Sequence, residues 1–130
     1  MIKGKKKVVL LICGLLLIAF VVVQVISNQI VNKANSISIN SVDLTEIKNG
    51  DYTGEYSVSP VYVKVKVVVQ NHQIKDIDIL KHSNGFGSSA ENIVDDIISN
   101  QSLDVDAVSG ATVSSKCILK AIENAVEKGK

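Results

Sequence analysis

The sequence predicts an α+β fold, in which an N-terminal transmembrane helix precedes a small domain of antiparallel strands and two amphipathic helices. Three observations support this prediction. Residues 8–26 are almost entirely apolar, valines alternate with mainly polar residues over 61–69, and apolar residues recur at helical spacing over 88–98 and 113–126. A chain of 130 residues has room for one small domain beside the apolar segment. The predicted order is a basic end at 1–7, an anchor at 8–26, a linker at 27–42 and a domain at 43–130.

The apolar segment is long enough to cross a bilayer. At about 1.5 Å per residue, a helix over 8–26 covers about the 30 Å of the hydrocarbon core. No comparable basic cluster follows the segment directly, whereas four lysines precede it: Lys3, Lys5, Lys6 and Lys7. Because lysines concentrate on the cytoplasmic side of membrane helices, we expect residues 1–7 in the cytoplasm. The chain after Ile26 is then extracytoplasmic, on a single-pass anchor in the cell membrane.

Two other interpretations of the N-terminus fit the sequence less well. A cleavable signal peptide has a shorter apolar core and a small-x-small exit, which residues 25–27 do not provide. A lipoprotein signal needs small residues before its cysteine, whereas Leu11 and Ile12 precede Cys13. The linker at 27–42 is predicted to be irregular, because its first part is rich in Asn and Ser and shows neither a helical period nor alternation.

The composition argues against several classes of partner. The net charge is +1 and the lysine cluster lies at the membrane end, so we expect no nucleic-acid partner. Two separated histidines and two distant cysteines offer no chelating spacing for a metal. Cys13 and Cys117 cannot pair within the folded monomer if Cys13 lies in lipid, so no disulfide is expected.

The first part of the domain is predicted to form a capped turn and three strands. Asp43 and Glu46 have the spacing of an N-cap and its capping-box acid. Pro60 suits a strand boundary, and a turn at 70–73 joins the last two strands into an antiparallel hairpin. The strands are predicted over residues 52–59, 61–69 and 74–80.

The second part of the domain is predicted to form two amphipathic helices. Ser88 and Glu91 have capping-box spacing, and an apolar stripe follows them until the helix ends at 99–102. A short extended piece at 103–108 leads to the second helix, whose apolar stripe covers 113–126. Two helices on a small antiparallel sheet bury enough surface for one α+β core.

A short motif lies where the extended piece meets the second helix. It combines an acid, small residues and hydroxyls: Asp106, Ser109, Gly110, Ala111 and Thr112. A helix start has unpaired backbone N–H groups and the positive end of the helix dipole, so a phosphate beside Thr112 is stabilised without a lysine. The residues therefore predict an anion site at this junction.

These residues resemble the flavinylation motif of the FMN-binding domain family, whose relatives include a flavin-carrying part of the sodium-pumping NADH:quinone oxidoreductase. That motif reads Asp, two or three variable residues, Ser or Thr, Gly, Ala and Thr, and its last Thr carries FMN through a phosphoester bond. The resemblance implies covalent FMN on Thr112. It extends to 49–56, the valine hairpin and 101–124, although the chain lacks the long insertions found in the large oxidoreductase complexes.

The resemblance also implies a flavin transferase as a partner. A threonine hydroxyl is a poor nucleophile at neutral pH, and nothing near Thr112 in the sequence offers it a base. The family relies on a transferase that moves FMN from FAD with release of AMP, and the small Gly110 and Ala111 would let the loop enter its cleft. From the residues alone, the alternative is that Ser109 or Thr112 only caps the second helix.

Four further candidates for the cofactor site have two interpretations each. Asp106 either contacts the transferase, through its magnesium, or is an exposed acid near a helix N-terminus. Ser114 and Ser115 lie in the first helical turn, where a hydroxyl bonds a phosphate oxygen or a backbone N–H. His82 faces solvent by default, or hydrogen-bonds the flavin ring, since family members often carry a histidine near this point. Phe86, between two glycines, is the aromatic candidate for stacking on the ring.

Taken with the resemblance, these features predict a membrane-anchored electron-transfer protein that carries FMN. The expected donor is a membrane quinol or an iron–sulfur protein, and the expected acceptor is another extracytoplasmic carrier or reductase. The protein would supply attachment, orientation and electrostatics, while the flavin supplies the redox chemistry. Two alternatives are a flavin-free binding or assembly module and a small reductase acting on an extracellular acceptor, which would need a substrate cavity beside the flavin.

Overall fold

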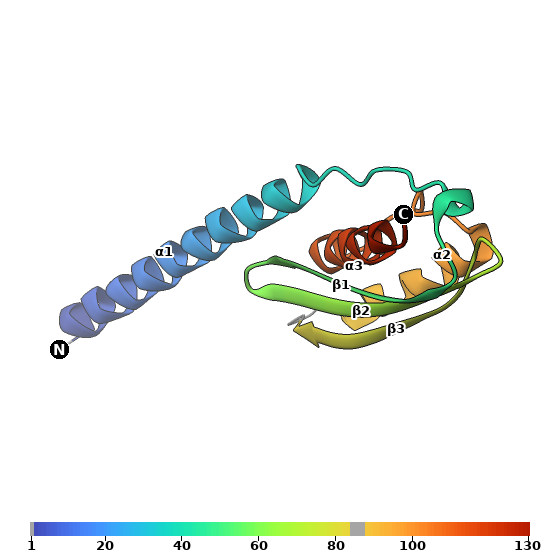
Figure 1. Cartoon of the computed structure of the whole chain (residues 1–130). Helices are drawn as coiled ribbons and strands as arrows, with labels where there is room; N and C mark the ends of the chain where they lie inside the picture. Colours follow the sequence, from blue (N-terminus) through green and yellow to red (C-terminus); the bar gives the residue numbers. More distant parts are fainter. Residues whose placement is uncertain (1, 84–87) are drawn as a thin grey trace. The chain divides into compact units, whose positions relative to one another are not determined.

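Figure 1 shows the computed structural model, which describes residues 2–83 and 88–130. The chain separates into two units, Met1–Ile30 and Val31–Lys130. The second unit is an α+β domain, as predicted, with a three-stranded antiparallel sheet and two α-helices. The aromatic candidate Phe86 lies outside the described residues.

Helix α1 (Ile2–Asn35) contains the predicted anchor. Among the described residues it is the one helix whose length and composition suit a membrane span. Its large apolar side chains between Val8 and Ile26 are exposed. At about 1.5 Å per residue, its 34 residues extend about 50 Å, which is longer than the ~30 Å of a bilayer core.

The prediction of an irregular linker from residue 27 is wrong for residues 27–35, which continue α1. Extending an existing helix adds one hydrogen bond per residue and avoids the cost of nucleation, so Asn and Ser are tolerated here despite weak propensity. The helix ends where the Ser36 hydroxyl donates to the Lys33 carbonyl at 2.7 Å. Residues 36–42 are irregular, as predicted.

The sheet contains β1 (Gly50–Val58), β2 (Val61–Gln70) and β3 (Gln73–Ser83), in that order, with both neighbouring pairs antiparallel. The three predicted strands are therefore confirmed, and each observed strand is slightly longer than predicted. The β2–β3 register shifts where β3 carries the extra residues Lys75 and Leu80, and Leu80 is left 51% exposed.

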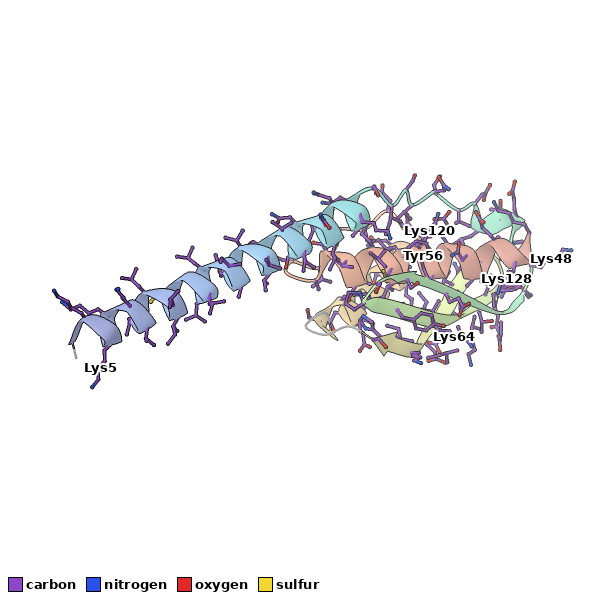
Figure 2. The ribbon with its side chains drawn as sticks, turned by 90° about the vertical axis from the view of Figure 1, so that its left-hand side faces the viewer. Lys5, Lys48, Tyr56, Lys64, Lys120 and Lys128 are labelled. Carbon is purple, nitrogen blue, oxygen red and sulfur yellow. The ribbon has the colours of Figure 1, made fainter. Side chains whose placement is uncertain are left out.

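Apolar and mainly polar residues alternate along β2, which gives the strand one buried face and one polar face. The five valines at alternate positions are buried: Val61, Val63, Val65, Val67 and Val69. Helix α3 (Thr112–Val126) packs on this side against β1 and β2 (Figure 1). Lys64 lies on the opposite, exposed side of the sheet (Figure 2), and Lys66 pairs there with Asp78 at 3.5 Å. One face of the sheet thus carries the core.

The helix predicted to start at Ser88 begins instead as a 3-10 turn, Ser88–Asn92, followed by α2 (Ile93–Asn100). The Glu91 carboxylate contacts the ring of His82 at 3.2 Å, and the capping box expected at Ser88 stays a prediction. The buried stripe is correct, since Ile93 and Ile97 are fully buried. Residues 104–108 lead to α3 without forming a strand.

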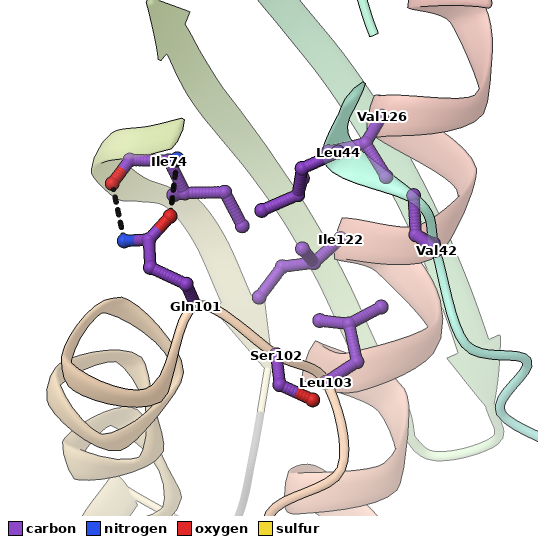
Figure 3. A pocket seen from close by; sticks show the side chains of 8 residues that line it. All are labelled: Val42, Leu44, Ile74, Gln101, Ser102, Leu103, Ile122 and Val126. Atoms are coloured by element: carbon purple, nitrogen blue, oxygen red, sulfur yellow. Dashed lines mark hydrogen bonds between the residues drawn. The ribbon is translucent and has the colours of Figure 1, made fainter. Parts of the chain in front are cut away.

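Gln101 joins the end of α2 to strand β3 (Figure 3). Its backbone is left-handed, with φ of 50°, and closes the helix. Its side-chain oxygen accepts from the Ile74 N–H at 2.7 Å, while its amide nitrogen donates to the carbonyls of Ile74 and Ile98 at 2.9 and 2.8 Å. The side chain thus occupies the hydrogen-bonding edge of β3 as a neighbouring strand would. A cavity of about 10 Å³ beside it is too small for a ligand.

Replacing Gln101 by alanine is expected to lower the free energy of unfolding by about 1–3 kcal/mol, because partly buried backbone groups of Ile74 lose their partners. Urea denaturation of the full chain in detergent measures this. The exposed Gln73 provides the control. Among the described residues its side chain bonds only Lys75, so Gln73→Ala should be near neutral. Equal effects of the two substitutions would contradict the assigned role.

The irregular segment after α1 is fastened to α3 by a buried carboxylate. Glu123 is 2% exposed and accepts from the Asn40 N–H at 3.2 Å and from the Asn40 amide at 3.0 Å. Lys120 reaches both Glu123 oxygens at 3.1 Å and also the Ser38 carbonyl (Figure 2). The last part of the predicted linker is therefore fixed to the domain.

Candidate functional site

The predicted motif lies at the start of α3, and Thr112 is the first residue of that helix. Ala111 holds the N-cap position, with φ of −133° and ψ of 41°, and no side chain caps the helix. The interpretation of Ser109 or Thr112 as the helix cap is therefore wrong. The first amide groups of any helix have no intrahelical acceptor, and in α3 no side-chain cap satisfies them.

The loop that precedes Thr112 is accessible. Asp106, Ser109 and Gly110 are exposed, Ala111 is buried, and Thr112 is half-buried. Gly110 has φ of 78°, and a Cβ built there would meet no atom within 4 Å. Glycine is thus needed for its left-handed backbone, while the space beside it stays open. A bulky phosphate-bearing group could approach the helix start from this side.

The two serines of the first turn have partners within the protein. The Ser115 hydroxyl accepts from the Val108 N–H at 2.9 Å and donates to the Ala111 carbonyl at 2.7 Å, so it folds the loop back onto the helix. Ser114 Oγ lies 3.0 Å from His82 Nε2. Both serines are buried, and their predicted contact with a phosphate stays a prediction.

The default interpretation of His82, a side chain that faces solvent, is wrong. It lies on β3 opposite Val63, and its side chain is 2% exposed. Its Nδ1 is 3.2 Å from a Glu91 oxygen, while Nε2 contacts Ser114. The structure therefore brings His82 and Ser114 together beside Thr112 and adds Glu91, whose sequence spacing had indicated only a helix cap. His72, in contrast, is exposed in its turn, as expected.

A groove of about 420 Å³ begins one turn along α3 from Thr112. It is lined by residues of the 39–41 segment, of the 103–105 segment and of α3, where Lys116 and Leu119 contribute. Lys116 is four residues after Thr112 and so lies on the same face of the helix. The groove thus combines open space, a cation, the acid Asp104 and both polar and apolar surface, and no sequence signal marked it.

Cys117 is a buried free cysteine in α3. Burial raises the pKa of its thiol, opposed by a backbone hydrogen bond at Val58. The thiol therefore stays protonated and unreactive near neutral pH. Both cysteines are free. Across residues 2–83 and 88–130, no group of three His, Cys, Asp or Glu side chains could hold a metal ion.

Comparison with known proteins identifies the family of the domain. Residues 58–127, more than half of the chain, match the family model for the FMN-binding domain. The chain belongs to the FMN-binding domain family.

Two relatives are much longer proteins. The chain is 35% identical over 85 residues to an NADH:acrylate oxidoreductase of Vibrio harveyi, an alignment that covers 63% of this chain and 8% of that protein. It is 37% identical over 79 residues to a urocanate reductase of Eggerthella lenta, covering 58% of this chain and 13% of the relative. The similarity therefore concerns one small part of each relative.

The helix start fits the phosphate of FMN. Thr112 offers a hydroxyl that no cap requires, Gly110 leaves space beside it, and the uncapped amides of α3 provide donors for phosphate oxygens. Lys116 is the nearest cation along the same helical face. The residues present can hold FMN by its phosphate without a metal ligand.

Proposed function

We propose that this protein is a membrane-anchored, extracytoplasmic electron-transfer protein that carries FMN through a phosphoester bond on Thr112. One observation carries the proposal: α3 begins at Thr112 behind an exposed loop, and its N-cap, Ala111, has no hydroxyl. The threonine oxygen is thereby left for a covalent bond at a helix start that stabilises negative charge. Membership of the FMN-binding domain family supports the choice of cofactor.

Attachment requires a flavin transferase with FAD as donor. Thr112 Oγ forms a bond to the phosphorus of the FMN half, the P–O bond to the AMP half breaks, AMP leaves, and the hydroxyl proton passes to a base of the transferase. The exposed Asp106, Ser109 and Gly110 are the residues of this chain that such an enzyme can contact. Ala111 and Gly110 leave its approach unobstructed.

Anchoring by α1 supports electron transfer beside the membrane. The lysines that precede the apolar segment favour a cytoplasmic N-terminus and an extracytoplasmic domain. Bound FMN would accept electrons from a membrane quinol or iron–sulfur protein and pass them to an extracytoplasmic carrier or reductase. Tethering raises the local concentration of the domain near such partners, which suits brief encounters.

The groove one turn along α3 from Thr112 favours a second candidate, a reductase of a small acceptor. Its volume of about 420 Å³ admits a small molecule, and its lining offers both a cation, Lys116, and an acid, Asp104, to a polar acceptor. The names of both relatives refer to unsaturated carboxylates, acrylate and urocanate. A single-turnover assay decides between the two functions: reoxidation of the reduced, flavin-loaded protein by either carboxylate alone would favour the reductase.

Intact-mass analysis of the full chain, produced with its transferase, tests the proposed function. We expect a mass higher than that of the unmodified chain by about 438 Da, as phosphoester formation requires. Absorbance near 450 nm should remain with the polypeptide after denaturation. A colourless protein of unmodified mass, in the presence of an active transferase, would instead favour the flavin-free binding module.

A further inference from the structure

Three elements meet at the third residue of α3 through a chain of side chains. Glu91 comes from the 3-10 turn before α2, His82 from β3 and Ser114 from α3. The Glu91 oxygen is 3.2 Å from His82 Nδ1, and His82 Nε2 is 3.0 Å from Ser114 Oγ. We propose that His82 and Glu91 are positioning residues for flavin attachment, which hold the start of α3 so that Thr112 presents its hydroxyl to the transferase. This inference rests on the proposed function.

The chemistry of the groups limits the direction of the hydrogen bonds. A carboxylate only accepts, so the contact with Glu91 requires a proton on His82 Nδ1. When the ring is neutral, Nε2 is an acceptor and the Ser114 hydroxyl donates to it. The two contacts thus select one tautomer of the neutral ring and fix the orientation of the imidazole.

Burial makes this arrangement difficult to replace. The side chain of His82 is 2% exposed and Ser114 is 1% exposed, so water has little access to the contact between them. The Glu91 side chain is 48% exposed and forms the solvent end of the chain. The inner contact therefore fastens the first turn of α3 to β3, and the outer contact sets the orientation of the imidazole.

The two first-turn serines fasten the start of α3 to its surroundings. Ser115 folds residues 108–111 onto the helix through Val108 and Ala111, and Ser114 fastens the same turn to β3 through His82. A threonine or serine at the cap would have used its own oxygen for the helix amides. In this protein the helix start is fastened by later residues and its amides stay uncapped, so Thr112 is held in place without giving up its hydroxyl.

Positioning affects the transfer step more than the binding of the transferase. In that step Thr112 Oγ bonds to phosphorus as the anhydride bond of FAD breaks, AMP leaves and the hydroxyl proton goes to a base of the transferase. A misplacement of about 1 Å in such a reaction costs about 100-fold in rate. The exposed loop that a transferase contacts is built from other residues, so its affinity should change little.

Transferase kinetics on the full chain in detergent test the proposal, with product followed by intact mass. His82→Ala and Ser114→Ala should lower kcat about 10- to 100-fold, with KM within about twofold of wild type. His82→Gln, whose amide offers one donor and one acceptor, should restore kcat to within about fivefold. His72→Ala, at the exposed histidine, is the matched control and should behave as wild type. A wild-type kcat in His82→Ala would overturn the proposal.

Two measurements keep the test decisive if His82→Ala fails to fold. Glu91→Ala changes a half-exposed side chain and should lower kcat about five- to tenfold in a folded protein; an unchanged kcat would overturn the proposal. Nitrogen-15 NMR of the chain without flavin should show the neutral His82 ring protonated on Nδ1, and protonation on Nε2 would overturn it as well. If the wild-type chain does not accept FMN from a transferase that is shown to modify another domain, the proposed function itself is refuted.

Discussion

Replacing Thr112 by alanine is expected to abolish covalent FMN while the domain stays folded. Thr112 is the proposed acceptor, and it is half-buried at a helix start whose cap position belongs to Ala111. Alanine keeps the helical propensity of the position, so loss of the hydroxyl should change the free energy of unfolding by less than about 1 kcal/mol. Intact mass should show no addition of about 438 Da over the unmodified variant, and no absorbance near 450 nm should stay with the polypeptide after denaturation.

Two neighbouring substitutions separate the acceptor from its surroundings. Ser109→Ala removes the exposed hydroxyl that lies three residues before Thr112. The added mass of FMN should stay in place, since Ser109 lies in the loop before the helix. Thr112→Ser keeps an oxygen on the same Cβ and should still be modified, at a lower rate. Flavin that resists denaturation in Thr112→Ala would show that the bond is made elsewhere in the chain.

The parts of the fold that could be predicted are those whose signal is local. Alternation over 61–69 specified β2, and the apolar stripe over 113–126 specified α3 to within one residue. The motif could be placed at the start of α3 because its residues are contiguous. The continuation of α1 through 27–35 was missed, because propensity describes isolated residues, whereas a helix already nucleated extends through poor formers.

The parts that could not be predicted depend on polar side chains that are distant in the sequence. Gln101 looked like the end of a helix, yet it pairs with the backbone of Ile74. No local pattern marks Glu123, yet it is buried against Asn40. Glu91 had capping-box spacing, yet its carboxylate contacts the ring of His82 on β3. A single sequence holds no record of such partners, since each is defined only after the elements pack.

Replacing Gly54 by alanine is expected to destabilise the domain severely. A Cβ at this position on β1 would lie 2.2 Å from the Ala121 carbonyl oxygen and 2.5 Å from the Ala125 nitrogen, both backbone atoms of α3. Backbone cannot rotate away as a side chain does, so either β1 or α3 must shift and open the core between them. We expect a loss above about 4 kcal/mol, comparable with the whole stability of a small domain, measured by urea denaturation of the full chain in detergent.

Gly110→Ala is the matched control for Gly54→Ala. At Gly110 a Cβ meets nothing within 4 Å, so only the left-handed backbone is penalised, at about 1 kcal/mol. Because the close approach at Gly54 sets α3 against the sheet, Gly54→Ala should lose flavin together with cooperative unfolding. Thr112→Ala should lose flavin with unfolding unchanged. If Gly54→Ala were as stable as wild type, β1 and α3 could not be in backbone contact, and the placement of Thr112 by that contact would be wrong.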